Sequence, residues 1–382
     1  MEKIKLGDLC TPSQGQLKEK PDTVIDYIDI SSVDNETKKV TGYQTMTFSE
    51  SPSRARKAVK RGSILVSTVR PNLNAVAILE NDTPNLSVAS TGFCILDCKE
   101  DTDERFVFNY CKSKVFIDDM VSQATGASYP AVSDKIVRSA LIPAYSYEKQ
   151  RHIGIILDKV SDVIEKRRAE LQALDKLIKA RFVELFGNPI TNDKGWEVAE
   201  LNTVCDGIGD GLHGTPEYDE DGEYPFINGN NLMDGVIKVT PATKMVNEDT
   251  YKKHFIELTD NAILLSINGT LGKLAFYNGE EVMLGKSACY CNLKPEINRE
   301  FVYGVMKTDA FAGFLESNAT ASTIKNVGLK AIRGFKLILP PEELQFQFIE
   351  FAKQVDKSKV IVQKALDETQ TLFDSLMQEY FG

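Results

Sequence analysis

The feature that most constrains this chain is a long stretch that occurs twice. Residues 147–187 return as residues 342–382, so that Gln150 matches Gln345 and Phe186 matches Phe381 at a constant offset of 195 positions. Apart from Gly154, neither copy contains an internal proline or glycine, the two residues that most disfavour helix interiors. Both copies are therefore predicted to be helices of about 40 residues.

Each copy carries an apolar stripe with a spacing of 3.5 residues, which is typical of a coiled coil. A helix of this length spans roughly 60 Å at ~1.5 Å per residue, and so narrow a stripe needs an equally long partner. We expect the copies to pair with each other; the alternative is that each packs on its own globular neighbour. The stripes are Ile153, Leu157, Val160, Ile164, Arg167, Leu171, Leu174, Ile178, Arg181 and Leu185, and then Phe348, Ala352, Val355, Lys359, Val362, Leu366, Thr369, Phe373, Leu376 and Tyr380.

The rest of the chain is also duplicated. Short apolar or alternating runs, separated by Gly, Pro, Asn and Asp, indicate β-rich structure before each long helix. Leu6–Cys10 corresponds to Leu201–Cys205, and Ser90–Leu96 corresponds to Ser287–Leu293. One helix is expected at Glu104–Val121. The predicted fold class is α+β, with β-rich domains at 1–145 and 188–340 in tandem repeat and long helices at 146–187 and 341–382.

Two similar halves in one chain suggest a pseudo-twofold axis. If that axis crosses the helix pair at right angles, the helices form an antiparallel coiled coil that separates the two domains. The second helix then brings Gly382 next to Met1, and a chain rejoined at that point is expected to fold.

Composition limits location and cysteine chemistry. The net charge is −10, and the seven cysteines include no CxxC pair, so buried free thiols are expected rather than disulfides or a zinc site. No run approaches the ~18 apolar residues of a membrane span, and the first residues do not resemble a signal peptide, which predicts a cytoplasmic protein. Much of the acid lies in Glu217–Glu223 and in the second long helix, so a local basic surface is compatible with the acidic total.

Motifs for catalysis are scarce. The three histidines, His152, His213 and His254, lack metal-ligand spacing. Gly279–Ser287 resembles a P-loop but has five residues between its glycines, where four are needed. No catalytic residue, metal or cofactor is predicted for this chain.

Polar loops are the candidate binding features. In the second half they are Gly211–Pro216, Asn228–Asn231, Asn268–Lys273 and Thr320–Lys325. Amide and hydroxyl groups read base edges, and basic residues hold phosphates, although loops of this composition are often only turns.

A basic segment in the first half, Arg54–Arg61, has five basic residues within eight and no acidic residue. It predicts either phosphate contact or a solvated helix face. Arg70 and Lys273 follow equivalent predicted strands, where we expect loops to converge on a groove.

These residues and their order resemble the specificity subunit of type I restriction-modification enzymes. The resemblance rests on Tyr27–Ile30, on Gly211–Pro216 followed by Tyr224–Ile227, on Asn268–Lys273, and above all on Ile142–Pro143 and Leu339–Glu343 leading into the long helices. It covers the whole chain, and the duplicated order is more specific than any single motif. Pro143–Ala144 stands where the family usually has paired prolines.

The resemblance implies a non-catalytic subunit that recognises double-stranded DNA. In that family each of two target-recognition domains reads one half of a bipartite, asymmetric site, and the helix pair sets the gap between the halves. The partners implied are two methyltransferase subunits, which bind S-adenosylmethionine, and restriction subunits, which bind ATP and Mg. The alternatives are a protein-binding coiled-coil scaffold without DNA binding, an enzyme that no motif supports, and the specificity chain of a restriction enzyme of another type.

On this interpretation, base choice is assigned to polar loop residues and affinity to the cations around them. The predicted DNA contacts are Arg54, Arg56, Lys60, Arg61, Arg70, Ser128 and Tyr129 in the first domain, and His213, Asn230, Asn231, Thr270, Lys273, Lys286, Ser322, Thr323 and Lys325 in the second.

Overall fold

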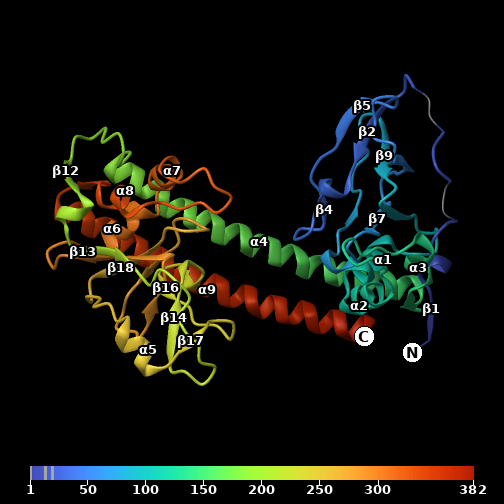
Figure 1. Cartoon of the computed structure of the whole chain (residues 1–382). Coiled ribbons are helices and arrows are strands. Elements are labelled where there is room, and N and C mark those ends of the chain that lie inside the picture. The colour runs from blue at the N-terminus through green and yellow to red at the C-terminus, as the bar shows by residue number, and fades with distance from the viewer. Residues whose placement is uncertain (1, 13–14, 19–20) are drawn as a thin grey trace. The chain divides into compact units, whose positions relative to one another are not determined.

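A computed structural model describes residues 2–12, 15–18 and 21–382 of the chain, and it divides into two compact units. Unit 1 comprises residues 1–171 and 361–382, and unit 2 comprises residues 172–360. Each unit therefore contains a β-rich part and one portion of each long helix (Figure 1).

Unit 1 is built on two main sheets. A four-stranded sheet has the order β5-β2-β9-β6 and a three-stranded sheet the order β10-β7-β8, while β1 pairs with β11 and β3 with β4. The strands are β1 (Lys3–Lys5), β2 (Val24–Ile28), β3 (Val33–Asp34), β4 (Lys39–Val40), β5 (Gln44–Thr47), β6 (Ala55–Ala58), β7 (Ile64–Ser67), β8 (Val76–Ile78), β9 (Leu86–Ser90), β10 (Phe93–Leu96) and β11 (Leu141–Pro143).

Three short helices pack on the smaller sheet of unit 1: α1 (Glu104–Lys112), α2 (Lys114–Gln123) and α3 (Asp134–Ser139). The single helix expected at Glu104–Val121 is wrong. Ser113 has extended backbone, and its hydroxyl accepts a hydrogen bond from the backbone N–H of Phe116 at 3.2 Å. It is thus the N-cap of a second helix rather than the middle of the first.

Unit 2 repeats this plan. Its main sheets have the orders β13-β21-β18-β19 and β17-β14-β20, and β12 pairs with β22 as β15 does with β16. The elements are β12 (Glu197–Glu200), β13 (Cys205–Asp210), β14 (Tyr224–Ile227), β15 (Leu232–Met233), β16 (Val236–Ile237), β17 (Met245–Val246), α5 (Glu248–Lys253), β18 (Ala262–Ser266), β19 (Leu274–Phe276), β20 (Met283–Leu284), β21 (Ala288–Leu293), α6 (Arg299–Met306), α7 (Asp309–Ser317), α8 (Leu329–Arg333) and β22 (Lys336–Leu339).

The repeat extends to the register of strand pairing. Ile4 pairs with Ile142 in unit 1, and Ala199 pairs with Leu337 in unit 2. The bridge between Cys10 and Cys98 likewise corresponds to that between Cys205 and Leu293. Each partner is displaced by the same 195 positions as the long helices. The prediction of two β-rich domains in tandem is confirmed.

The long helices are α4 (Tyr147–Phe186) and α9 (Glu342–Phe381). All twenty positions of the two predicted stripes are buried or half-buried. Within unit 2, Asp175 of α4 pairs with Lys359 of α9 at 2.7 Å, and the ring of Phe182 lies 5.3 Å from that of Phe348. The contacting residue on α9 comes earlier in the chain as the contacting residue on α4 comes later, so the two helices pack antiparallel.

The C-terminal end of each long helix is buried in the core of a unit. Phe182 and Phe186 of α4 pack on Phe301 in unit 2. Met377 and Phe381 of α9, at the corresponding positions, belong to the core of unit 1. The coiled coil and packing on a globular neighbour, offered as alternatives from the sequence, are thus both present.

Glu2, the first described residue, and the last turn of α9 contact adjacent residues of unit 1, near the C-terminus marked in Figure 1. The backbone N–H of Ala144 donates to the carbonyl of Glu2, and the hydroxyl of Tyr145 donates to the carbonyl of Tyr380 at 3.4 Å. Met1, predicted to lie beside Gly382, is outside the described residues. All seven cysteines are free thiols. Within the described ranges, no helix has both the length and the apolar content needed to cross a membrane.

Candidate nucleic-acid interface

In unit 1 several loops meet at one end of the main sheets, where β2, β7 and β9 end and β6 and β10 begin. We call these loops, residues 29–32, 54, 68–70, 90–92 and 125–132, loop cluster 1. Backbone hydrogen bonds of 2.7–2.8 Å join four of them: Thr91 N–H donates to Arg54, Thr68 N–H to Gly92, and Arg70 N–H to Pro130. The fifth, residues 29–32, is joined to Arg54 through the side chain of Asp29. The cluster is therefore one continuous surface carried by the sheet ends.

Arg70 and Tyr129 form an exposed cation–π pair in loop cluster 1. The guanidinium carbon of Arg70 lies 4.4 Å from the centre of the Tyr129 ring, and this tyrosine is 66% exposed. Arg70 has left-handed backbone angles, φ 49° and ψ 61°, which cost energy in a residue other than glycine and concentrate at functional sites. Gly126, at φ +102°, permits the tight loop, because a Cβ there would lie 2.7 Å from the carbonyl oxygen of Tyr129.

Arg54 lies at the start of β6, and this segment is a strand, so the helix-face interpretation of Arg54–Arg61 is wrong. Nε of Arg54 donates to the hydroxyl of Tyr27 at 3.0 Å, and Nη2 donates to Oδ2 of Asp29 at 2.5 Å. The contacts with Tyr27 and then Asp29 raise the pKa of Arg54, so the guanidinium stays charged. The segment also has a second acidic partner, since Lys57 pairs with Asp134 at 2.6 Å.

Three predicted contacts lie elsewhere. Lys60 and Arg61 are exposed in the turn that precedes β7, at the opposite end of that strand from Arg70. Arg56, within β6, is half-buried, donates to the carbonyl of Ala55 at 2.8 Å and lies over the ring of Phe48. The structure therefore brings Arg54, Arg70, Ser128 and Tyr129 together, and it does not bring Lys60 and Arg61 to them.

Unit 2 has the same arrangement of loops, which we call loop cluster 2: residues 211–214, 228–231, 266–273, 285–287 and 319–327. The bridge of Val69 with Ala131 corresponds to that of Asn268 with Asn326. The bond from Val132 N–H to Thr68 corresponds to that from Val327 N–H to Ile267. The same backbone frame is thus built twice and carries different side chains.

All nine contacts predicted for the second domain lie in loop cluster 2. His213 Nε2 is 2.8 Å from Asp210 Oδ2, and exposed Lys286 follows in the adjoining loop, where its N–H donates to Leu212. Lys325 pairs with Glu316. The side chains of half-buried Lys273 and of exposed Asn230, Thr270 and Thr323 make no hydrogen bond or ion pair with another described residue.

Some predicted contacts in loop cluster 2 maintain the loops themselves. The amide of Asn231 accepts from Asn228 N–H at 3.0 Å and donates to Lys238 and Thr243. The hydroxyl of Ser322 donates to Ile324 at 2.6 Å. Sequence reasoning missed the residues that position these loops, Asp29 in unit 1 and Asn228 and Ser287 in unit 2. The position of Asn228 could have been recognised from the repeat, because Asn228 follows β14 as Asp29 follows β2.

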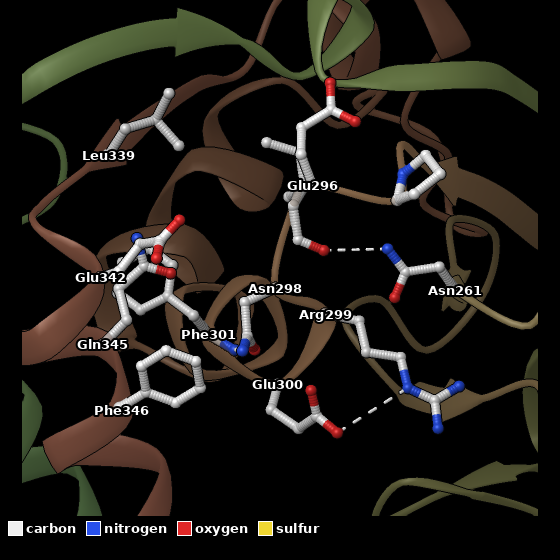
Figure 2. A pocket seen from close by; sticks show the side chains of 12 residues that line it. Asn261, Glu296, Asn298, Arg299, Glu300, Phe301, Leu339, Glu342, Gln345 and Phe346 are labelled. Atoms are coloured by element: carbon white, nitrogen blue, oxygen red, sulfur yellow. Dashed lines mark hydrogen bonds and ion pairs between the residues drawn. The ribbon is translucent and has the colours of Figure 1, made fainter.

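Figure 2 shows a separate hollow in unit 2, about 530 Å³ in volume. One of its lining residues, Asn261, directly precedes β18, so the hollow lies at the opposite end of that strand from loop cluster 2. Arg299 of α6 and its N-cap residue Asn298 line one side, and Gln345 and Phe346 of α9 line the other. In unit 1 the corresponding Gln150 is buried, and its carboxamide accepts from Asp103 N–H at 3.1 Å and donates to Tyr145 at 2.9 Å.

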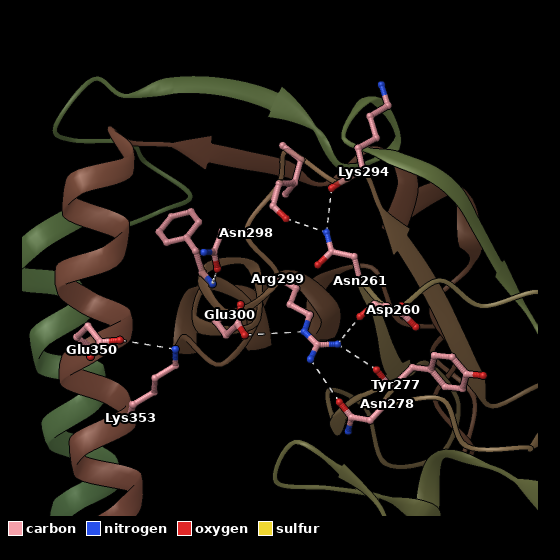
Figure 3. A network of polar contacts seen from close by, with 12 residues as sticks. Asp260, Asn261, Tyr277, Asn278, Lys294, Asn298, Arg299, Glu300, Glu350 and Lys353 are labelled. Carbon is pink, nitrogen blue, oxygen red and sulfur yellow. Dashed lines mark hydrogen bonds and ion pairs between the residues drawn. The ribbon is translucent and has the colours of Figure 1, made fainter.

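The arginine beside this hollow is held by structural acceptors (Figure 3). Nη1 of Arg299 donates to the carbonyls of Asp260 and Tyr277 at 2.5 and 3.0 Å, and Nη2 donates to Asn278 at 3.3 Å. It therefore fastens the loops around β18 and β19. Among the described residues no group of three or more His, Cys, Asp and Glu side chains is placed to hold a metal ion. The loop clusters, which combine cations, amides and an exposed aromatic ring, match the chemistry of nucleic-acid contact better.

Comparison with known proteins identifies related sequences. A family model described as the type I restriction modification DNA specificity domain matches residues 1–174 and 193–369. The chain is 22% identical over 355 residues to the type I restriction enzyme MjaIX specificity subunit of Methanocaldococcus jannaschii, covering 83% of this chain and 76% of that protein. It is 27% identical over 138 residues to the HindI specificity subunit of Haemophilus influenzae, covering 35% of this chain and 30% of that protein.

Two solved structures share the fold. One chain comes from a structure described as the basis of complex assembly and conformational transition of the type I R-M system. It has 22% identity and a TM-score of 0.61, with 100% of this chain and 97% of that chain covered. The type I restriction-modification S subunit from M. genitalium has 15% identity and a TM-score of 0.55, with 100% and 96% covered.

Proposed function

Because the chain belongs to the family of type I restriction-modification DNA specificity subunits, which are non-catalytic, we propose that loop clusters 1 and 2 are its two DNA-reading surfaces. The observation that carries this proposal is the duplicated frame. The loop after β7 is bonded to the loop before α3 in the same register as the loop after β18 is bonded to the loop before α8. Two equal frames support two similar contacts with DNA.

The side chains on the two frames differ, which supports an asymmetric, bipartite site. Loop cluster 1 presents Arg54, Arg70 and Tyr129, whereas loop cluster 2 presents Asn230, Thr270 and Lys273. Arginine prefers guanine, and asparagine prefers adenine in the major groove. Residues 1–145 then act as one target-recognition domain and residues 188–340 as the other, each reading its own half-site.

We infer that α4 and α9 are the spacer between the half-sites, related by a pseudo-twofold axis. The antiparallel packing within unit 2 and the buried or half-buried state of every stripe position support a paired spacer. A rigid spacer sets a fixed gap between two readers, which is how dimeric readers impose half-site spacing.

The chain is a subunit of a type I restriction-modification system, and we infer its partners from that membership. Two methyltransferase subunits bind this chain and carry S-adenosylmethionine. Restriction subunits join them and bind ATP and Mg²⁺. A cytoplasmic location follows from the proposed partners, because the chain has to meet them and the DNA there.

The test reconstitutes the chain with its methyltransferase partner and maps methylated bases in the DNA. We expect a split motif of two different halves at a fixed gap, and we expect exchange of residues 1–145 with those of a related subunit to change one half only. Binding should weaken steeply as salt rises. Methylation without a split motif would contradict the bipartite reading, and no salt-dependent retention of DNA would favour the protein-binding scaffold instead.

A further inference from the structure

The guanidinium of Arg54 is held along one edge and unoccupied along the other. Tyr27, which is 2% exposed, accepts from Nε, and Asp29 accepts from Nη2. The side chain of Arg54 is nonetheless 56% exposed, against 20% for Asp29. A guanidinium has five N–H groups. Among the described residues, no acceptor binds the two N–H groups of Nη1 or the remaining N–H group of Nη2.

The ion pair of Arg54 with Asp29 is better explained as an orienting contact than as a stabilising one. A pair with one member this exposed contributes little to stability. Asp29 already has a structural role, since its Oδ1 accepts from Ile30 N–H at 2.8 Å and caps the turn at 30–32. Its Oδ2 is left to fix the direction in which Arg54 points.

The unoccupied edge of Arg54 carries two parallel N–H donors. Guanine presents the matching pair of acceptors, O6 and N7, in the major groove, whereas adenine presents a donor at N6 beside N7. A single phosphate also accepts from arginine, but it does not select a base. Because Tyr27 and Asp29 already restrict the side chain, little further conformational entropy is lost on binding. The arrangement therefore favours bidentate contact with guanine.

The surroundings of Arg54 place this contact on the reading surface of unit 1 and not of unit 2. Its carbonyl accepts from Thr91 N–H, within the chain of bonds that leads to Arg70 and Tyr129. In unit 2, Asn228 stands at the position of Asp29, and its Oδ1 accepts from the hydroxyl of Ser287 at 2.9 Å rather than from an arginine.

We propose that Arg54, held by Asp29 and Tyr27, reads a guanine in the half-site recognised by unit 1. This inference rests on the proposed function, because it assigns a base to one residue of a reading surface. Asp29 is a positioning residue for that contact and does not itself touch the base.

The test measures binding of the assembled complex to duplexes in which each guanine of the mapped site is replaced, one at a time, by 7-deazaguanine. We expect one position in one half-site to lower wild-type affinity by about tenfold, since half of a bidentate contact is lost. Arg54→Ala should bind less tightly to the natural site and show no further loss at that position. Arg61→Ala, at the other end of β7, is the matched control and should keep the wild-type profile.

Asp29→Asn separates positioning from folding. An amide oxygen still accepts from Ile30 N–H, but the charge that holds Arg54 is removed. We expect about three- to tenfold weaker binding to the natural site, a smaller penalty at the same 7-deazaguanine, and unchanged sensitivity in the other half-site. Arg54→Lys should also lose the preference, because an ammonium lacks the fork of parallel donors.

Two results would overturn the inference alone. In one, Arg54→Ala weakens binding to every duplex equally and lowers the salt dependence, which identifies a phosphate contact. In the other, the 7-deazaguanine profile of Arg54→Ala equals that of the wild type. A wild-type complex that methylates no split motif would instead contradict the proposed function, so the two failures are distinguishable.

Discussion

The ring of Phe381, in the last turn of α9, lies 5.4 Å from the ring of Phe106 in α1. Phe381 is fully buried in the core of unit 1, as Phe186 at the equivalent position of α4 is fully buried in unit 2. The two long helices are therefore joined to the units by corresponding aromatic contacts as well as by their shared stripe.

Replacing Phe381 should destabilise unit 1 strongly. Phe381→Ala removes a fully buried ring, which typically costs about 3–5 kcal/mol in the free energy of unfolding, and Phe186→Ala should do the same for unit 2. Urea unfolding followed by circular dichroism measures both. Phe346→Ala, at a position 56% exposed, is the control and should change stability by less than about 0.5 kcal/mol. Equal effects for all three variants would contradict this account of the core.

A circular permutant should fold. Glu2 is hydrogen-bonded to Ala144, and Tyr380 to the adjacent Tyr145, so we expect a short Gly/Ser linker after residue 382 to be sufficient to rejoin the chain. We open the chain between Glu220 and Asp221, in an exposed turn of unit 2. The permutant is expected to keep the helix content and cooperative unfolding of the parent. An unfolded product would argue against the antiparallel arrangement.

Lys112 should make stability depend on pH. Its Nζ lies 4.4 Å from the centre of the Phe108 ring, and burial lowers its pKa to about 8, opposed by Asp158 and reinforced by Lys38. Because the unfolded value is near 10.5, the folded state binds the proton less tightly. The free energy of unfolding is therefore highest above pH 10.5, where Lys112 is neutral in both states. This contribution of Lys112 is lost as the pH falls through 8.

The measurement compares wild type with Lys112→Met by urea unfolding at pH 7 and at pH 10. The variant should be the more stable at pH 7, by as much as about 3 kcal/mol, and the difference should shrink at pH 10. Lys114→Met, at a lysine whose side chain is 82% exposed, is the control. If wild type and variant differed in stability by the same amount at both pH values, Lys112 would be charged in the folded protein without a cost in free energy.

Arg70 and Lys273 should supply affinity rather than base choice. Each follows a central strand, β7 or β18, within its loop cluster. Arg70→Ala or Lys273→Ala should weaken DNA binding by the assembled enzyme and reduce the salt slope by about one, with the recognised sequence unchanged. Lys60→Ala, at the far end of β7, is the comparison. Unchanged binding of both variants at moderate salt would remove these residues from the interface.

Lengthening the spacer should change the gap. Four residues inserted into both helices, after Leu171 and after Val360, add about 6 Å at ~1.5 Å per residue, close to two base pairs of the duplex at ~3.4 Å each. Methylation mapping should then show the same two half-sites at a wider gap. An unaltered gap would contradict the spacer, whereas loss of both half-sites would point to a disrupted helix pair.

Patterns that repeat along the chain predicted the fold well. The stripes through Ile153 and Phe348 follow directly from helix periodicity, and the tandem units follow from the offset. The buried Phe182 lies outside the predicted stripe, because it meets the core of unit 2 as well as α9, and a periodic seam carries no information about that second contact.

The candidate site was only partly predictable. Composition marked the polar loops, but it does not give the direction of a strand, and so it grouped Lys60 with Arg54 although β6 carries them to opposite ends. Nor does it distinguish a side chain that faces outward from one such as Asn231, whose amide is consumed by its own loop. Those distinctions depend on pairings between residues far apart in the chain.

The division of unit 1 into two distant segments affects its synthesis. The ribosome makes residues 1–171, then all of residues 172–360, and only afterwards the segment that carries Met377 and Phe381. The nascent first unit thus waits with part of its apolar interior uncovered while the second unit emerges. A chain interrupted before residue 361 would leave that surface available to chaperones and proteases, so only chains that have passed this point during translation are able to complete both units.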